Sequence, residues 1–425
     1  MSSPLLLPED TVKRLKLRDS SLVGAEKNGA RKISIGLLSP PSSNTSRSVS
    51  TASSASAEIV YISVPTRLDS AQTLEFMGLT PEKAQTLYAS RQQRQQQTQK
   101  NIDLQGWVVE NVVSLCADTH DDGDDWKEKM QEVGVKQEIS DALIKEEHYA
   151  IRGVQSLSMW LQDILETNYL ALVDMNARIL QELAPPSGVN LRGGEGEPYT
   201  VPQTPGGHIT LFKSVEFRRC AGCIAEDGSV NLARLESTGP TDFSRRGGLY
   251  FTHQIWVSNH YSSLITDACP VADRRTVELH VPLSHLAEMK VWDLKFEEDN
   301  FKQLLFFSRR DEKYPKPISQ LRASHGIISG PIGHVHNLAF GKMKSWNEIT
   351  DKHQLQEREA FVDIEGNEKE TVKYGKQWVW ISENSVAQLE EECRNKVYLR
   401  RPEQGLKLVP QPGKDEFVKG KGIMN

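Results

Sequence analysis

Two adjacent glycines stand between an arginine pair and an aromatic, β-branched run in the stretch TDFSRRGGLYFTHQ, residues 241–254. Glycine has no Cβ, so its backbone can turn sharply or come close to a ligand. Alternate side chains of the strand expected here share one face, which places Tyr250 and Thr252 together. An aromatic ring and a hydroxyl beside Gly247 and Gly248 form a candidate ligand site.

Three other groups of residues could hold a metal ion or a phosphate, and each has a simpler interpretation. Cys220 and Cys223 form a single CxxC pair, whereas a zinc site normally needs further ligands at finger spacing. His334 and His336 alternate along one segment, which is more typical of a loop without chemistry. The acidic run at 118–126 lacks the glutamate that ends a calcium loop. We therefore predict no metal centre.

The second half of the chain must position the candidate site, and its pattern is that of strands. Short apolar runs bounded by Gly, Pro, Asp or Ser recur from residue 208 onward. They cover residues 208–217, 247–256, 275–282, 303–310, 325–333 and 377–384. One segment between them, residues 262–269, could be helical. Strands with one or two interspersed helices indicate an α+β fold.

The first half differs in composition and contains stronger helix signals. A helix should begin at Pro81, and one long or two consecutive helices should occupy Ser140 to Leu183, where apolar residues follow helical spacing. A strand is expected near residues 58–65. The chain is thus divided into a disordered Ser/Thr/Pro-rich tail at 1–57, a mainly helical region at 58–190, a linker at 191–207, a β-rich domain at 208–400 and a C-terminal tail at 401–425.

Composition limits the classes of function. The chain has 425 residues and a formal net charge of -6, with no basic stretch that would indicate nucleic acid binding. Its five cysteines are few and odd in number, which favours free thiols in a reducing compartment. It has no apolar segment long enough to span a membrane. We expect a soluble protein of the cytoplasm or nucleus that does not bind membranes, with a protein as target or partner.

The order of the predicted elements resembles the ADP-ribosyltransferase superfamily, in particular its divergent intracellular, toxin-like branch. A strand with a cationic residue comes first, the GLYFT strand second, and the strand led by Gln377 last. The resemblance covers roughly residues 209–392. It implies a split β-sheet domain that uses NAD as a substrate, either transferring ADP-ribose to a target or hydrolysing NAD.

The resemblance also implies roles for individual residues. Lys213 would contact phosphate or ribose, while Gly247 and Gly248 would let the backbone approach the nicotinamide amide. Tyr250 would stack on the nicotinamide ring, and Thr252 would donate its hydroxyl. These five residues would bind NAD and assist its cleavage.

The last strand departs from the pattern of an active transferase. Gln377 occupies the place of the family's catalytic glutamate, and its amide can bond a ribose hydroxyl but cannot supply negative charge to an oxocarbenium ion. Glu368, Glu370 and Glu383 are nearby carboxylates that are expected at the surface. Two functions follow: a transferase or NAD glycohydrolase, or an inactive NAD- or ADP-ribose-binding or protein-interaction module. A third interpretation is a scaffold whose likeness to the family arises by chance.

Overall fold

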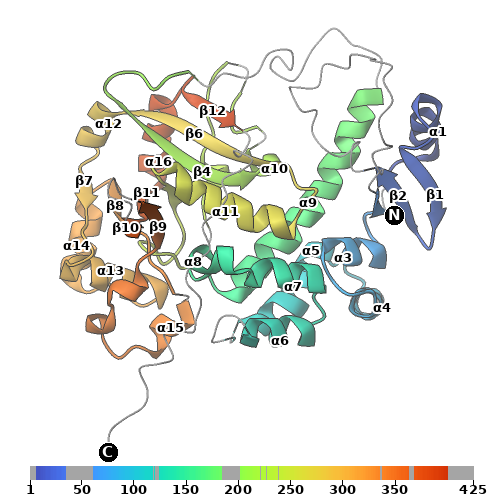
Figure 1. The fold of residues 1–425 in the computed structure, drawn as a ribbon, viewed down its shortest axis with the longest axis horizontal. Coiled ribbons are helices and arrows are strands. Elements are labelled where there is room, and N and C mark those ends of the chain that lie inside the picture. The colour runs from blue at the N-terminus through green and yellow to red at the C-terminus, as the bar shows by residue number, and fades with distance from the viewer. Residues whose placement is uncertain are drawn as a thin grey trace, which may run out of the picture.

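The computed structural model describes residues 6–34, 61–117, 119, 124–183, 202–220, 222–225, 227–237, 239–335, 337–362 and 368–400. Helices and strands are mixed throughout these residues, which confirms the expected mixed α and β composition. The helices of the first half gather on one side of the molecule and the larger sheets on the other, with the long helix α9 reaching toward the N-terminal strands (Figure 1). No helix among these residues is both long and apolar enough to cross a membrane.

The N-terminal segment forms a small sheet packed on α9. Its elements are α1 (Glu9–Arg18), β1 (Val23–Lys27), β2 (Ala30–Ser34) and β3 (Tyr61–Pro65), and the sheet order is β1-β2-β3. Leu15, Val23 and Ile33 are buried in one cluster with Leu172 and Met175 of α9. The prediction of disorder for residues 1–57 is therefore wrong for residues 9–34, because α9 supplies the apolar surface that this short segment lacks. Residues 35–57 lie outside the described residues.

A run of helices follows β3. They are α3 (Ala71–Met77), α4 (Pro81–Thr98), α5 (Leu104–Val108), η1 (Val109–Val113), η2 (Ser114–Cys116), α6 (Asp124–Glu132), α7 (Gln137–Ile144), η3 (Glu146–His148), α8 (Tyr149–Arg152) and α9 (Leu157–Leu183). Helix α4 begins at Pro81 as predicted, with the Thr80 side chain accepting from Lys83 N. The segment expected as one or two helices instead contains the end of α7, the short η3 and α8, and then α9, with a break at residues 153–156 between α8 and α9. That break faces the strand-rich half.

The strand-rich half contains two sheets that meet at one point. Its strands are β4 (His208–Glu216), β5 (Leu249–Phe251), β6 (Arg274–Pro282), β7 (Val291–Asp293), β8 (Ile327–Pro331), β9 (Gln356–Val362), β10 (Glu368–Tyr374), β11 (Lys376–Trp380) and β12 (Val397–Arg400). The order is β5-β11-β8-β7 in one sheet and β12-β6-β4 in the other. A single bridge between Phe212 and Thr252 joins β4 to β5, and β9 and β10 form a separate hairpin.

Helices lie between these strands. They are α10 (Phe217–Cys220), η4 (Ala233–Leu235), α11 (Ile255–Ala268), α12 (Leu283–Glu288), α13 (Asp299–Arg309), α14 (Lys316–Ser324), α15 (Asn337–Lys342), η5 (Trp346–Glu348), η6 (Asp351–His353) and α16 (Glu383–Glu392). The helix expected at 262–269 is confirmed as part of α11. The strand expected at 303–310 is wrong, because this run lies mainly in α13. Phe301, Leu304 and Leu305 follow helical spacing and are fully buried.

The helical region and the strand-rich half share a core. Val257, Leu264 and Ile265 of α11 are buried in one cluster with Leu161 and Ile164 of α9. Burial of apolar surface on both sides of α11 stabilises the two halves against each other.

The predicted linker at 191–207 is described only from residue 202, and the C-terminal tail at 401–425 lies outside the described residues.

Candidate functional site

A cavity of about 140 Å³ lies where the two sheets meet and the break before α9 approaches them. Its lining residues are Val154, Gln155, Phe212, Lys213, Ser214, Ser237, Thr241, Asp242, Tyr250, Phe251, Thr252, Val257, Ser258, Tyr261, Arg309, Ile332 and Gln377. Four of the predicted site residues are among them: Lys213, Tyr250, Thr252 and Gln377. We call this space the intersheet cavity.

Gln377 is buried and its amide is used within the protein. Antiparallel pairing of β11 with β8 places Gln377 opposite Gly330. The Nε2 of Gln377 donates to Asp242 Oδ2 at 2.6 Å and to the Pro331 carbonyl at 3.0 Å. Its Oε1 has no hydrogen-bond partner among the described residues. This oxygen is the part of the side chain that remains available to a ligand.

Asp242 is the centre of a buried polar network that the sequence did not reveal. Its carboxylate accepts from Arg309 Nε at 2.6 Å, from Gly333 N at 2.7 Å and from Gln377. Asp242 is 3% exposed and Arg309 is 4% exposed, so the charge of each is balanced mainly by the other. Arg309 also donates to the Val154 carbonyl at 2.9 Å. The network therefore ties β11, α13 and the break before α9 together.

The two residues expected to face a ligand from β5 already have internal hydrogen bonds. Thr252 Oγ1 donates to the Lys376 carbonyl at 2.7 Å and accepts from Gln254 N at 3.1 Å. The Tyr250 hydroxyl contacts Thr241 Oγ1 and accepts from Phe243 N at 3.2 Å. Burial raises the pKa of Tyr250 above its ordinary value. The hydroxyl groups of both residues thus hold the local backbone in place.

Lys213 is a titratable group of the cavity whose surroundings strongly shift its pKa. Burial, followed by the positive charge of Arg219, lowers the pKa of Lys213 to about 7, while Asp163 opposes this shift. The ammonium group has no ion-pair or hydrogen-bond partner among the described residues. A half-buried amine of this kind can change charge near neutral pH and gain a partner when an anion binds.

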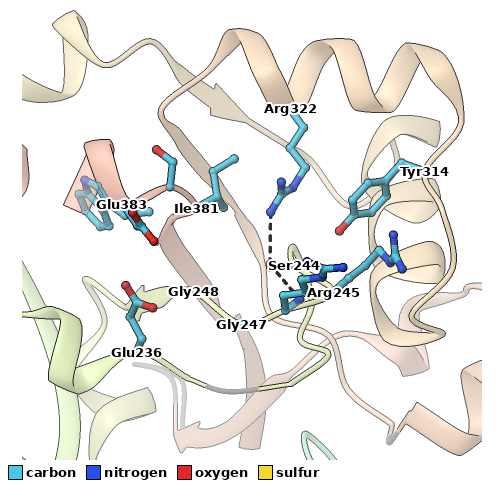
Figure 2. A pocket seen from close by; sticks show the side chains of 12 residues that line it. Glu236, Ser244, Arg245, Gly247, Gly248, Tyr314, Arg322, Ile381 and Glu383 are labelled. Atoms are coloured by element: carbon cyan, nitrogen blue, oxygen red, sulfur yellow. Dashed lines mark hydrogen bonds between the residues drawn. The ribbon is translucent and has the colours of Figure 1, made fainter. Parts of the chain in front are cut away.

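Gly247 and Gly248 do not line the intersheet cavity, contrary to their expected place beside the other site residues. They line a second pocket (Figure 2), which we call the arginine pocket. Gly247 has a φ of +90°, which glycine adopts without strain. A Cβ on Gly248 would lie 3.2 Å from the Trp380 carbonyl oxygen. The glycine pair therefore allows a sharp turn and close packing against β11.

Glu370 and Glu383, two other carboxylates near β11 in the sequence, do not line the intersheet cavity. Glu383 lines the arginine pocket, and Glu368 and Glu370 lie on the separate hairpin strand β10. Asp242 is thus the one carboxylate among the residues that line the intersheet cavity. The cavity offers amide, hydroxyl and amine groups and one ion-paired carboxylate.

The described residues that could ligate a metal ion do not form a favourable metal site. Cys220 and Cys223 are buried free thiols, and burial raises the pKa of Cys220 to about 12. Among the described residues, one His/Asp/Glu group has ligand atoms within 4.8 Å of one another: Glu147, His148 and Asp267. The Lys145 ammonium lies 2.6 Å from Asp267 Oδ2, so a positive charge is already present there. His336 and most of the acidic run at 118–126 lie outside the described residues.

No protein-family model, curated protein or solved structure matches this chain. Its function must therefore be inferred from the chemistry of the two pockets. The sequence led to Lys213, Tyr250, Thr252 and Gln377 but missed Asp242 and Arg309. Asp242 stands five residues before the glycine pair and Arg309 ends an apolar run, and neither position carries a motif.

Proposed function

We propose that this chain is an ADP-ribosyltransferase-like protein that binds NAD, or the related ADP-ribose, as a ligand of its strand-rich half, without efficient transfer chemistry. One observation carries the proposal. Lys213, Tyr250, Thr252 and Gln377 come from three separate strands or strand ends, and all four line the intersheet cavity.

The size of the cavity limits which part of the ligand could enter. A protein cavity of about 150 Å³ is known to hold one benzene ring, whereas pockets for whole small molecules are typically about 300–1,000 Å³. The intersheet cavity, at about 140 Å³, fits a single ring such as nicotinamide. The carboxamide could donate to Gln377 Oε1, and Lys213 could attract the phosphates. The rest of the dinucleotide would have to lie outside the cavity.

The charges of the site favour binding over transfer. Cleaving the bond between nicotinamide and ribose develops positive charge on the sugar, which a nearby carboxylate stabilises. Gln377 is neutral, and Asp242 is paired with Arg309. We therefore place the inactive binding module before the enzyme.

Transfer of ADP-ribose or hydrolysis of NAD is the second candidate. It is favoured by the Asp242 carboxylate, which lies directly behind the Gln377 amide and lines the same cavity. Release of nicotinamide from NAD by the wild-type chain, lost in Gln377→Ala, would support this candidate over the first.

Titration calorimetry with NAD tests the proposal. Lys213→Met should weaken NAD binding by about tenfold, because one charge-assisted contact to phosphate is lost. Lys32→Met is the matched control, since Lys32 is an exposed strand lysine of the N-terminal sheet. Absence of NAD and ADP-ribose binding to the wild type, or equal affinities of Lys213→Met and the control, would contradict the proposal.

A further inference from the structure

The arginine pocket has a volume of about 330 Å³, within the range of pockets that hold small molecules. Its lining residues are Glu236, Ser244, Arg245, Arg246, Gly247, Gly248, Tyr314, Arg322, Trp380, Ile381, Ser382 and Glu383. None of them lines the intersheet cavity. The two pockets are thus separate candidate sites.

One side of the arginine pocket is basic. Arg322 and Arg245 lie there beside Tyr314 (Figure 2). Arg322 donates to the Phe243 carbonyl through Nε and to Ser244 Oγ through Nη2, and Arg245 pairs with an exposed aspartate through Nε. The side chain of Arg246 is exposed and has no partner among the described residues. Each guanidinium therefore keeps N–H groups that a ligand could use.

The opposite side of the pocket is acidic. Glu236 and Glu383 lie across from Arg322 and Arg245 (Figure 2). Neither carboxylate has a hydrogen-bond or ion-pair partner among the described residues. Glu236 is half-buried, which increases the benefit of a positive partner there.

We propose that the arginine pocket binds a small dipolar ligand that carries a phosphate group and an amine on one molecule. The phosphate would face the arginines, because the N–H groups of a guanidinium match the oxygens of a phosphate. Three arginines also offer more donors than a ligand with one carboxylate could accept. The amine would face Glu236 and Glu383. A phosphate alone leaves both carboxylates unpaired and repels them, and an amine alone leaves the arginines unpaired. This proposal does not depend on NAD binding.

Phosphoethanolamine is a suitable probe, because it is a small molecule with both groups. Its binding to the full chain is compared by calorimetry with that of inorganic phosphate and of ethanolamine. Arg246→Gln and Glu383→Gln remove one charge from each side, and both residues are exposed, so folding should be unaffected. Arg94→Gln and Glu82→Gln, exposed on α4, are the matched controls.

The expected result is saturable binding of phosphoethanolamine, tighter than that of either single-charge compound. Each pocket variant should weaken it by about tenfold, as expected for loss of one charged contact, and the controls should leave it unchanged. Equal binding of phosphate and phosphoethanolamine, with no effect of Glu383→Gln, would show an anion site and overturn the dipolar ligand. Absence of millimolar binding of phosphoethanolamine to the wild type would overturn the site itself. Unfolding curves of all variants identify any loss caused by misfolding, in which case Glu236→Gln replaces the affected acidic variant.

Discussion

Replacing Gln377 by glutamate tests the contact between this side chain and Asp242 most directly. The wild-type amide donates to Asp242 Oδ2 at 2.6 Å and to the Pro331 carbonyl at 3.0 Å. An ionised glutamate has no donor and would place a second carboxylate against Asp242. We therefore expect Gln377→Glu to destabilise the protein at neutral pH rather than to supply a working catalytic carboxylate.

The size of the stability loss in Gln377→Glu depends on whether the new glutamate ionises or stays protonated. Two negative charges about 4 Å apart repel each other by about 4 kcal/mol at an effective dielectric constant of about 20. The alternative is to keep the new glutamate protonated at pH 7, which costs about 3.7 kcal/mol for a group of ordinary pKa about 4.3. The protonated group could donate to Asp242 as the amide does. Because the two costs are similar, we expect a loss of about 3–4 kcal/mol in the free energy of unfolding.

The loss should depend on pH in a defined direction. Asp242 raises the folded-state pKa of the new glutamate above its unfolded value, so stability is full below about pH 4 and falls as the pH rises through the raised pKa. Urea unfolding of the wild type, Gln377→Glu and Gln377→Met at several pH values measures this. Gln377→Met is the control, since it removes the same hydrogen bonds without adding a titratable group. A stability difference between Gln377→Glu and wild type that is equal at about pH 5 and pH 8 would refute the reasoning.

Three further substitutions give separate expectations. Asp242→Asn should lower the free energy of unfolding by about 3–5 kcal/mol in urea denaturation, because it leaves the buried charge of Arg309 uncompensated; a loss below about 1 kcal/mol would contradict the network. Gly248→Val should lower the free energy of unfolding by about 1–3 kcal/mol, because its side chain would crowd the Trp380 carbonyl, and Gly248→Ala should lower it less. Equal melting temperatures for the wild type and both variants would contradict this packing. Lys213 has its folded pKa lowered from 10.5 to about 7, so the free energy of unfolding of the wild type should rise with pH between these values relative to Lys213→Met. Parallel stability curves for the two proteins would contradict the lowered pKa of Lys213.

The strands that carry the site could be predicted because their patterns are local. Alternation in β4 and β11 and the turn residues around them are visible in the sequence. Tyr250 and Thr252 share a face of β5 through the two-residue period of a strand, and both line one cavity. Placing Gln377 and Lys213 beside them also required the order of the strands, which the family resemblance suggested.

The elements that were missed depend on partners far away in the chain. Residues 304–307, LLFF, form a continuous apolar run of four, and such a short run cannot be assigned to helix or strand by periodicity alone. The run forms helix α13 because its side chains are buried against residues of β8 and β11. Residues 9–34 are likewise too polar to fold alone and are ordered by contact with α9. In both cases the tertiary environment outweighs the local signal.

The same dependence on distant partners determines how the intersheet cavity can bind a ligand. Thr252 already donates to a backbone carbonyl, and the Gln377 amide already donates to Asp242. A ligand that displaced either bond would leave a buried polar group without its partner, which costs about 1–3 kcal/mol for each group. The Lys213 ammonium, Gln377 Oε1 and the Ser258 hydroxyl, which has no hydrogen-bond partner among the described residues, can bind without this cost. Lys213 is the one of these three groups that carries a charge, so binding of an anionic ligand should weaken as the pH rises above about 7 and Lys213 loses that charge.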